Sequence, residues 1–372
     1  MKLLYLTDQV YQHGGAEKIL IQKANFWADV YGYEVVVLTA SQKGRGAFFP
    51  LSDKVRLHDL GMEYPKGSLY HPRNFGRFRQ QYARLKAFAD DFRPDAVFVV
   101  SQTIFRQITP FACKGFRTFY ESHTTWYGFK LAYDRQSPAM KIKTKIIAAI
   151  TRFCESKYTK VVYLNPSELE HHNRPNAVVI PNFFDVTEER NPAIERRNIA
   201  ISLGRLSFPK GYDLLIEAWG MLDSKIENWE MHVYGDGEDR EKLENQLART
   251  NFRNPFRFLP AINKVNEKLS EASLYVMSSK FETFPLVLLE AMSNGLPIVS
   301  FDCPTGPRSI VTPDRDGILV PALQTGELAD AVIKLMNDPE LRREMGEHGR
   351  ENVRRFSAEK VMKQWDDLIR ST

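Results

Sequence analysis

Two glutamates stand eight positions apart, on either side of a Phe-Pro step, in the segment "SSKFETFPLVLLEAMSNGLPIVSFDCPTGP". Pro285 suits the first turn of a helix and the Asn294-Gly295 pair supplies a C-terminal stop, so we expect a helix from about Pro285 to Asn294. Glu282 then lies in the preceding loop and Glu290 about five residues into the helix. Carboxylates separated in this way suit an extended ligand better than one compact atom.

The expected helix start between the two glutamates is a candidate anion site. The backbone around Phe284, Pro285 and Leu286 lies there. Main-chain N–H groups without intrahelical partners, together with the helix dipole, favour a bound anion at such a start. Carboxylates that flank a phosphate would bind hydroxyl groups, so a sugar on one side and a ribose on the other fit the pattern.

The alternative is that one glutamate is a solvated loop residue and the other a charged residue of a surface helix. That is the commoner fate of an arbitrary glutamate pair. The composition of the segment disfavours it, because Glu290 is the only charge in "PLVLLEAM".

Length and composition indicate a folded protein of two domains. The 372 residues exceed what one hydrophobic core usually serves, and the 43% apolar and 26% charged residues are close to the globular average. Neither a signal peptide nor an apolar run of membrane-spanning length is apparent. The three cysteines, Cys113, Cys154 and Cys303, fit neither a disulfide framework nor a zinc site. We therefore expect a soluble, cytoplasmic protein.

Short apolar runs rich in β-forming residues alternate with amphipathic helical patterns, which is typical of parallel βαβ units. The expected strands cover residues 2–8, 34–40, 55–61, 96–101, 118–123, 161–165 and 177–181, and then 199–204, 229–235, 256–260, 274–279, 297–301 and 317–320. Helical patterns at 326–337, 339–353 and 357–370 close the chain.

A polar segment, "DVTEERNPAIERRN" at 185–198, interrupts this alternation and has the character of a linker. The predicted fold class is therefore α/β, with two Rossmann-like parallel-sheet domains facing across a cleft. We expect a first domain at 1–184, a second domain at 185–355 and a C-terminal helix at 356–372 that can cross back to the first domain. Ligands of such sheets bind beyond the carboxyl ends of the strands.

Other segments carry glycines and cations at expected strand ends. They are "HGGAEKIL", "VIPNFFD", "SLGRLSFPKGYDLLIEAW" and "VYGDGEDREKLENQL". Together with the two-glutamate segment, and in this order, they resemble motifs of the retaining glycosyltransferases of family 4, also described as glycosyl transferases group 1, which have the GT-B fold. The resemblance covers nearly the whole chain, and it implies an N-terminal Rossmann-like acceptor-binding domain at 1–184 and a C-terminal Rossmann-like nucleotide-sugar-binding domain at 185–355. One departure is "PNFFD", where many relatives have "PNGVD": Asn182 matches and Phe183 replaces a glycine.

The resemblance implies roles for single residues. The implied catalytic residues are Glu282, His123, Arg205 and Lys210, of which the two cations neutralise the leaving diphosphate and the histidine lies beside the donor sugar. The implied donor-binding residues are Gly14, Gly15, Arg205, Lys210, Pro260, Ala261, Glu282, Phe284, Pro285, Leu286 and Glu290, with Thr305 and Gly306 bordering the donor sugar. Glu290 would bind the ribose hydroxyls, and Pro260 and Ala261 would pack the base.

Taken without the resemblance, several of these residues have ordinary explanations. Arg205 and Lys210 could be surface cations, Gly14-Gly15 a tight turn, and His123 a structural histidine. The glycine segment lacks the G-x-G-x-x-G spacing of a dinucleotide site, so an NAD-binding function is not supported.

The resulting hypothesis is a glycosyltransferase. It would move a hexose or N-acetylhexosamine from a nucleotide sugar, a UDP-sugar in the first place, to a glycan or lipid-linked acceptor. The anomeric configuration would be retained, in the biosynthesis of a cell-surface polysaccharide or glycolipid. No metal and no cofactor beyond the donor are expected. The alternatives are a GT-B protein without transfer activity, such as a sugar-nucleotide epimerase, and an inactive sugar-nucleotide-binding protein.

Charge is unevenly distributed along the chain. Residues 73–160 carry 17 Lys/Arg and 6 Asp/Glu, an excess of +11, so the rest of the chain carries −6 of the net +5. Within that region, residues 140–160 form a basic amphipathic pattern, which either docks on its own sheet or contacts an anionic membrane surface on the inner face of the plasma membrane. No nucleic-acid-binding motif is apparent, so nucleic acid is not an expected partner.

Overall fold

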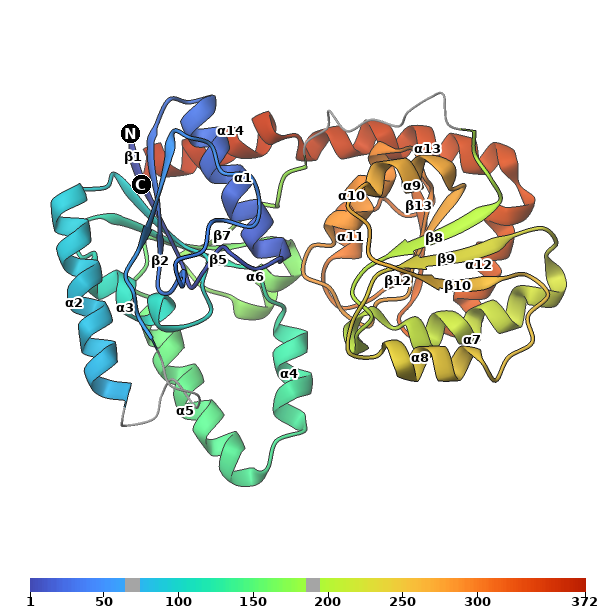
Figure 1. Cartoon of the computed structure of the whole chain (residues 1–372), viewed down its shortest axis with the longest axis horizontal. Coiled ribbons are helices and arrows are strands. Elements are labelled where there is room, and N and C mark those ends of the chain that lie inside the picture. The colour runs from blue at the N-terminus through green and yellow to red at the C-terminus, as the bar shows by residue number, and fades with distance from the viewer. Residues whose placement is uncertain (64–73, 185–194) are drawn as a thin grey trace. The chain divides into compact units, whose positions relative to one another are not determined.

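The computed structural model describes residues 1–63, 74–184 and 195–372 (Figure 1). The chain divides into two compact units: residues 1–181 together with 361–372, and residues 182–360. Most of the predicted linker at 185–198 lies outside the described residues.

A seven-stranded sheet, parallel throughout, forms the centre of the first unit. Its strands are β1 (Lys2–Thr7), β2 (Glu34–Thr39), β3 (Val55–Asp59), β4 (Ala96–Val99), β5 (Arg117–Ser122), β6 (Lys160–Tyr163) and β7 (Ala177–Val179). Across the sheet they are ordered β3-β2-β1-β4-β5-β6-β7. β1 and β4 are therefore neighbours from which the chain proceeds in opposite directions, which makes them a topological switch point.

Helices cover both faces of this sheet. They are α1 (Gly15–Asp29), α2 (Phe75–Phe92), α3 (Ile104–Ala112), α4 (Trp126–Asp134), α5 (Pro138–Glu155), α6 (Pro166–His172) and, from residue 361 on, α14 (Ala358–Ser371). Leu4 and Leu6 of β1 belong to a core cluster with α2 and α3, whereas Tyr5 between them stacks on Phe98 at 4.7 Å. The sheet is buried on both sides, which explains why its strands read as nearly continuous apolar runs.

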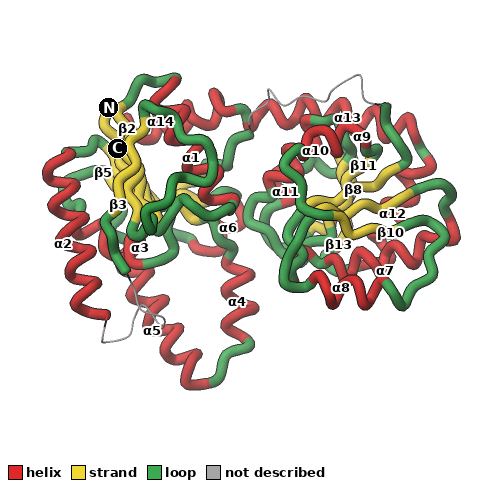
Figure 2. Tube along the Cα trace, viewed as in Figure 1, coloured by secondary structure: helices red, strands yellow, loops and turns green. Residues whose placement is uncertain are grey.

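The second unit repeats the plan with a six-stranded sheet, again parallel throughout (Figure 2). Its strands are β8 (Ile199–Leu203), β9 (Glu230–Tyr234), β10 (Phe256–Leu259), β11 (Leu274–Met277), β12 (Ile298–Asp302) and β13 (Gly317–Pro321). Their order is β10-β9-β8-β11-β12-β13, so the switch point lies between β8 and β11. All thirteen strands expected from the sequence are present, with ends that differ by a few residues.

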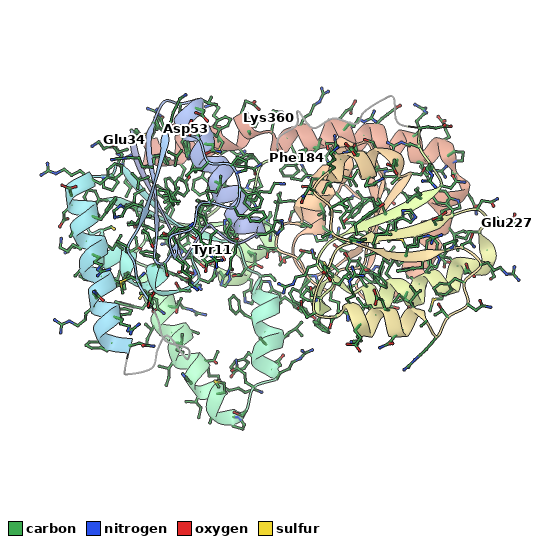
Figure 3. The ribbon with its side chains drawn as sticks, in the orientation of Figure 1. Tyr11, Glu34, Asp53, Phe184, Glu227 and Lys360 are labelled. Carbon is green, nitrogen blue, oxygen red and sulfur yellow. The ribbon has the colours of Figure 1, made fainter. Side chains whose placement is uncertain are left out.

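Helices of the second unit also form two layers. They are α7 (Tyr212–Leu222), α8 (Arg240–Leu247), α9 (Val265–Glu271), α10 (Leu286–Ser293), α11 (Pro307–Ile310), α12 (Thr325–Asn337) and α13 (Pro339–Val353), with a short 3₁₀ turn at Phe208–Lys210. α7 packs with α8 and α12, and α10 packs with α9, α11 and α13. Side chains fill the space between the helices and the sheet in each unit (Figure 3).

Several helices begin with the same local signal, a polar cap followed by proline. The pairs are Ser137-Pro138 before α5, Asn165-Pro166 before α6 and Asp338-Pro339 before α13. In each case the cap side chain accepts a hydrogen bond from a main-chain N–H of the first turn. Proline at the first helical position loses no hydrogen bond, since its nitrogen would have no intrahelical partner there.

The C-terminal helix α14 is held on the first unit by its buried face. Trp365 is 1% exposed and meets the rings of Phe98 and Phe119 edge-on at 5.6 and 6.4 Å. The ammonium group of Lys23, from α1, lies 4.3 Å from the centre of the Trp365 ring. Tyr33 donates to Asp366 at 2.8 Å, so polar contacts supplement the aromatic ones.

Lys23 and Glu121 form an ion pair in the interior of the first unit. Both side chains are 1% exposed, and Lys23 Nζ donates to Glu121 Oε2. Burial opposes the charge on Glu121, but Lys23 and His123 outweigh it and hold the pKa of Glu121 below its ordinary value. The pair joins α1 to β5, and the ring of Trp365 packs against the ammonium group of Lys23.

The helix α5 is not fully docked on its sheet. Its buried residues are Thr151, Cys154 and Glu155, near its C-terminal end. The apolar stripe that could have packed inward is exposed, at 63% for Ile142, 57% for Ile146 and 51% for Ile150. These three isoleucines are therefore not packed against the sheet, as the hypothesis of a docked helix at 140–160 would require. Within the described residues, none of the helices combines the length and the apolarity that crossing a bilayer requires.

We predict that Glu121→Gln lowers the free energy of unfolding of the first unit by about 3–5 kcal/mol, because it leaves Lys23 buried without a counter-charge. The matched control is Asp90→Asn, which breaks the exposed Lys86–Asp90 pair and should cost less than about 1 kcal/mol. Urea unfolding measures both. Equal effects of the two substitutions would contradict the interpretation, and the double variant Lys23→Met/Glu121→Leu should recover most of the loss.

Candidate active site

The switch point of the second unit brings together two residues that are far apart in the sequence. The loop after β8 carries Lys210 and the loop after β11 carries Glu282. Lys210 Nζ donates to Glu282 Oε1 at 2.6 Å. The two side chains are 24% and 14% exposed, so the pair is partly accessible to a ligand.

Close backbone packing fixes the loop that carries Lys210. Gly211 has φ +63°, and a Cβ there would lie 2.1 Å from the carbonyl oxygen of Ser278. The Ser278 hydroxyl donates to the Lys210 carbonyl oxygen at 3.1 Å, and the Lys280 N–H donates to that of Pro209 at 2.7 Å. A glycine is needed here both for the left-handed conformation and for the close approach.

A second set of contacts fixes Glu282. The Ser279 hydroxyl donates to its Oε1 at 2.8 Å, so this oxygen accepts from both a serine and a lysine. The Thr305 hydroxyl donates to the Glu282 carbonyl oxygen. A Cβ on Gly306, which has φ +86°, would lie 2.9 Å from Glu282 Cβ. The loop after β12 therefore supports the glutamate from behind.

The pair is electrostatically balanced without a ligand. Burial alone would lower the pKa of Lys210, but Glu282 and Tyr212 outweigh it and raise the pKa above its ordinary value. Lys210 is thus a cation at neutral pH. An anion could accept a hydrogen bond from Lys210 while a hydroxyl group donates one to Glu282. A sugar phosphate has both kinds of group.

The helix α10 starts beside this pair, one residue later than predicted. It runs over Leu286–Ser293 with Pro285 as its N-cap residue, and no side chain caps it. Phe284 points into the core, where its ring meets Phe356 edge-on at 5.5 Å, so the backbone of this residue is the part available to a ligand.

Glu290 is the fifth residue of α10 and is half-buried. Burial raises the pKa of Tyr275 well above its ordinary value, and the negative charges of Glu290 and Glu282 both add to this rise. Both glutamates therefore act electrostatically on the Tyr275 hydroxyl, which donates to the carbonyl oxygen of Leu203 at the end of β8.

Three other predicted site residues, Arg205, Pro260 and Ala261, make no contact with the Lys210–Glu282 pair among the interactions of the described residues. Arg205 is 73% exposed and donates to Glu238 at 3.0 Å. Pro260 and Ala261 are exposed immediately after β10. The structure thus brings Lys210 and Glu282 into contact, whereas Arg205 binds Glu238 instead.

In the first unit, Gly14 and Gly15 lie at the start of α1, as expected. Gly14 is the N-cap residue, and a Cβ there would lie 2.0 Å from Glu17 Oε2. Glu17 in turn accepts from Gln9 at 2.9 Å. A carboxylate of the chain itself therefore already lies against this helix start, while nothing lies within 4 Å of a Cβ on Gly15.

His123 directly follows β5, and its Nε2 lies 3.5 Å from Glu121 Oε2. This Nε2 is buried without a hydrogen-bond partner in the described part of the chain. Glu121 also binds Lys23, so the histidine lies beside a carboxylate that the core itself holds.

Sequence reasoning did not identify Ser279 and Tyr212 as part of the site. Ser279 lies three positions before Glu282 in the same loop, and this short spacing was the available signal. Tyr212 follows Gly211, is buried, and has its pKa raised to about 12 by burial. Nothing in the sequence distinguishes it from an ordinary core tyrosine.

A different cavity of the second unit, of about 410 Å³, lies at the amino ends of its strands. Four arginines line it: Arg196, Arg342, Arg343 and Arg350. Arg196 donates to carbonyl oxygens that follow α10, and Arg342 to carbonyl oxygens in the last turn of α12. These are acceptors that a helix end leaves unsatisfied, so we assign Arg196 and Arg342 a structural role.

Comparison with known proteins adds independent information. Residues 184–352 match the model of the family described as glycosyl transferases group 1. An uncharacterized glycosyltransferase of Haemophilus influenzae is 26% identical over 375 residues, which cover 99% of both chains. The amylovoran biosynthesis glycosyltransferase AmsD of Erwinia amylovora is 24% identical over 380 residues, again 99% of both chains.

A solved structure shows the same architecture. HepE from Anabaena, in complex with UDP and glucose, has a TM-score of 0.78 with this chain at 19% sequence identity, and the match covers 100% of both chains. The fold is therefore GT-B, with two Rossmann-like parallel-sheet domains, and the comparisons support a glycosyltransferase.

Proposed function

We propose that this protein transfers a hexose or N-acetylhexosamine from a UDP-sugar to a glycan or lipid-linked acceptor, with retention of the anomeric configuration. The pathway would be the biosynthesis of a cell-surface polysaccharide or glycolipid. The Lys210–Glu282 ion pair beside the start of α10 carries this proposal. AmsD, which takes part in amylovoran biosynthesis, and HepE, which binds UDP and glucose, support it by similarity.

The site offers separate partners for the parts of a nucleotide sugar. Lys210 and the uncapped main-chain N–H groups of α10 would bind the diphosphate. Glu282 would accept hydrogen bonds from the transferred sugar and Glu290 from the ribose, while Pro260 and Ala261 would contact the base. Arg205 would leave Glu238 to reach the phosphates, which its exposed position allows.

Catalysis would rest on stabilising the departing diphosphate and on holding donor and acceptor together. His123, which Glu121 positions, would stabilise the transition state beside the sugar, and Gly14 and Gly15 would let the backbone approach it. The acceptor hydroxyl would form the new glycosidic bond on the face that the diphosphate leaves, and the diphosphate oxygen would take up its proton. This scheme requires no nucleophile from the protein and no metal.

Two alternatives are a sugar-nucleotide epimerase and an inactive sugar-nucleotide-binding protein. Product analysis separates them from a transferase, since an epimerase releases an altered sugar nucleotide and an inactive protein releases none. Nucleotide release alone does not distinguish them, because hydrolysis also produces it.

We also propose that α5 holds the protein reversibly on an anionic membrane. The exposed stripe of Ile142, Ile146 and Ile150 is accompanied by Lys141, Lys143 and Lys145 on the same helix. Exposed isoleucines would insert at the interface, and each lysine near an anionic surface contributes about 1 kcal/mol. A lipid-linked acceptor would then be reached without a membrane-spanning segment.

The first prediction of the proposed function concerns the donor. In a thermal-shift comparison of UDP-, GDP- and ADP-sugars, UDP-sugars should raise the melting temperature most. Glu290→Gln should remove this shift because the ribose loses its acceptor, whereas Glu217→Gln, an exposed glutamate on α7, should keep it. An unchanged shift in Glu290→Gln would refute the assigned role of this residue.

The second prediction concerns the reaction. With a panel of octyl glycosides as acceptors, the product should keep the anomeric configuration of the donor, as read from its anomeric proton coupling by NMR. Lys210→Ala should lower kcat/KM by about 10²–10³-fold, as removal of one charge-stabilising donor does. Lys264→Ala, an exposed lysine paired with Glu267, should leave it unchanged. An inverted product would contradict the proposed mechanism.

The third prediction concerns the membrane. Co-sedimentation with vesicles of phosphatidylcholine mixed with phosphatidylglycerol should exceed that with phosphatidylcholine alone. The triple variant Ile142→Ser/Ile146→Ser/Ile150→Ser should bind at least about 100-fold more weakly, since each buried isoleucine contributes about 1.5–3 kcal/mol. The controls are Val30→Ser and Met221→Ser, which are equally exposed apolar residues elsewhere. Binding that does not depend on anionic lipid would refute the proposal.

A further inference from the structure

The first unit has its own topological switch point, between β1 and β4. Asp8 directly follows β1, and Ser101 and Thr103 follow β4 closely. Parallel α/β sheets bind their ligands at such points, beyond the carboxyl ends of the strands. In the second unit the equivalent position holds the Lys210–Glu282 pair, which suggested a ligand site there. Asp8 occupies the corresponding position in the first unit.

Asp8 is held by two hydroxyl groups on one of its oxygens. Ser101 Oγ donates to Asp8 Oδ1 at 2.9 Å, and Thr103 Oγ1 donates to the same oxygen. The Ser101 hydroxyl also accepts from the Thr103 N–H at 3.1 Å, which fixes its own orientation. Within the described residues no side chain donates to Oδ2. The carboxylate is therefore oriented, with one oxygen left to accept from a ligand.

Asp8 lines a cavity of about 480 Å³. The wall near the strand ends is formed by Asp8 and Thr103, and its apolar part by Met62 and Ile104. Lys43 and Glu63, both exposed, also line it, as do Ala40, Ser41 and Gln81. The Lys43 ammonium group also lies 5.9 Å from the ring of Tyr11, a residue labelled in Figure 3. All of these residues belong to the first unit.

Ionised Asp8 is costly in this position without a further hydrogen bond. Burial raises the pKa of Asp8, and the hydroxyl groups of Thr103 and Ser101 only partly oppose this effect. A ligand hydroxyl that donates to Oδ2 would supply the missing interaction and would be bound more strongly than by a neutral acceptor.

The lining selects the chemical class of the ligand. Two carboxylates, Asp8 and Glu63, disfavour a phosphate, while a single lysine can donate to a ring or hydroxyl oxygen. Met62 and Ile104, each 2% exposed, close the apolar end of the cavity against the core. A neutral, polyhydroxylated ring has hydroxyl groups for the carboxylates and the lysine, and it fits a cavity of this size.

We propose that this cavity is the subsite for the acceptor sugar, in which Asp8 accepts a hydrogen bond from an acceptor hydroxyl. Thr103 and Ser101 act as positioning residues for the carboxylate. The inference rests on the proposed function, because it assigns the second substrate of the same reaction. It goes beyond that proposal in naming the residues that recognise this substrate.

The test compares Asp8→Asn with Asp59→Asn. Asp59, at the end of β3, accepts from the Thr39 hydroxyl at 3.0 Å and so resembles Asp8, but it does not line the cavity. With octyl glycosides of glucose, galactose, N-acetylglucosamine and N-acetylgalactosamine as probes, Asp8→Asn should raise the acceptor KM about 10–100-fold, as expected for a lost hydrogen bond to a charged group. Asp59→Asn should leave it unchanged, and Thr103→Val should raise it about fivefold through misplacement of Asp8.

Donor measurements separate this inference from the proposed function. In Asp8→Asn the UDP-sugar thermal shift and the rate of acceptor-independent UDP release should equal those of the wild type, and an unchanged circular dichroism spectrum and melting temperature without ligand should show that the first unit folds. A wild-type protein without donor binding would overturn the proposed function. Normal donor binding together with an unchanged acceptor KM in Asp8→Asn would overturn the acceptor subsite alone. Failure of every glycoside to bind the wild type in saturation-transfer NMR would also overturn the subsite.

Discussion

The parallel pairing of every strand is the constraint on which the candidate sites depend. Parallel strands need a crossover for each connection, so all of their carboxyl ends lie along one edge of each sheet. Loops that leave this edge can be long and irregular without disturbing the core. Lys210 and Glu282 meet for this reason, since β8 and β11 are neighbours although 72 positions separate the two residues. The sheet determines which loops meet, and the loops determine the chemistry.

Much of this could be predicted from the sequence because it depends on local patterns. Alternating apolar runs predicted the strands, and Pro285 together with Asn294-Gly295 predicted α10 to within a residue at each end. The loop position of Glu282 and the helical position of Glu290 followed from the same signals.

Side-chain direction and long-range packing could not be predicted in this way. Arg205 and Lys210 lie five positions apart in one loop, yet Lys210 binds Glu282 and Arg205 binds Glu238. Lys210 directly precedes Gly211, whose left-handed turn packs against Ser278 in the segment that leads to Glu282, and no local sequence pattern reports that contact. Asp8 was missed for a related reason: a single aspartate after a strand is no motif until the sheet order makes its strand a neighbour of β4.

The two switch points differ in charge, and this difference fits two unlike substrates. At the switch point of the second unit, a lysine balanced by a glutamate lies beside the positive end of a helix, which suits a phosphate that carries hydroxyl groups. At that of the first unit, a carboxylate held by two hydroxyl groups would repel a phosphate and favour a neutral donor of hydrogen bonds. This asymmetry would suit a transferase with a charged donor and an uncharged sugar acceptor, because Asp8 and Glu63 outnumber Lys43 in the first-unit cavity and disfavour a phosphate there. Both units have the same kind of parallel sheet, and the few residues that follow the central strands give each switch point a different charge.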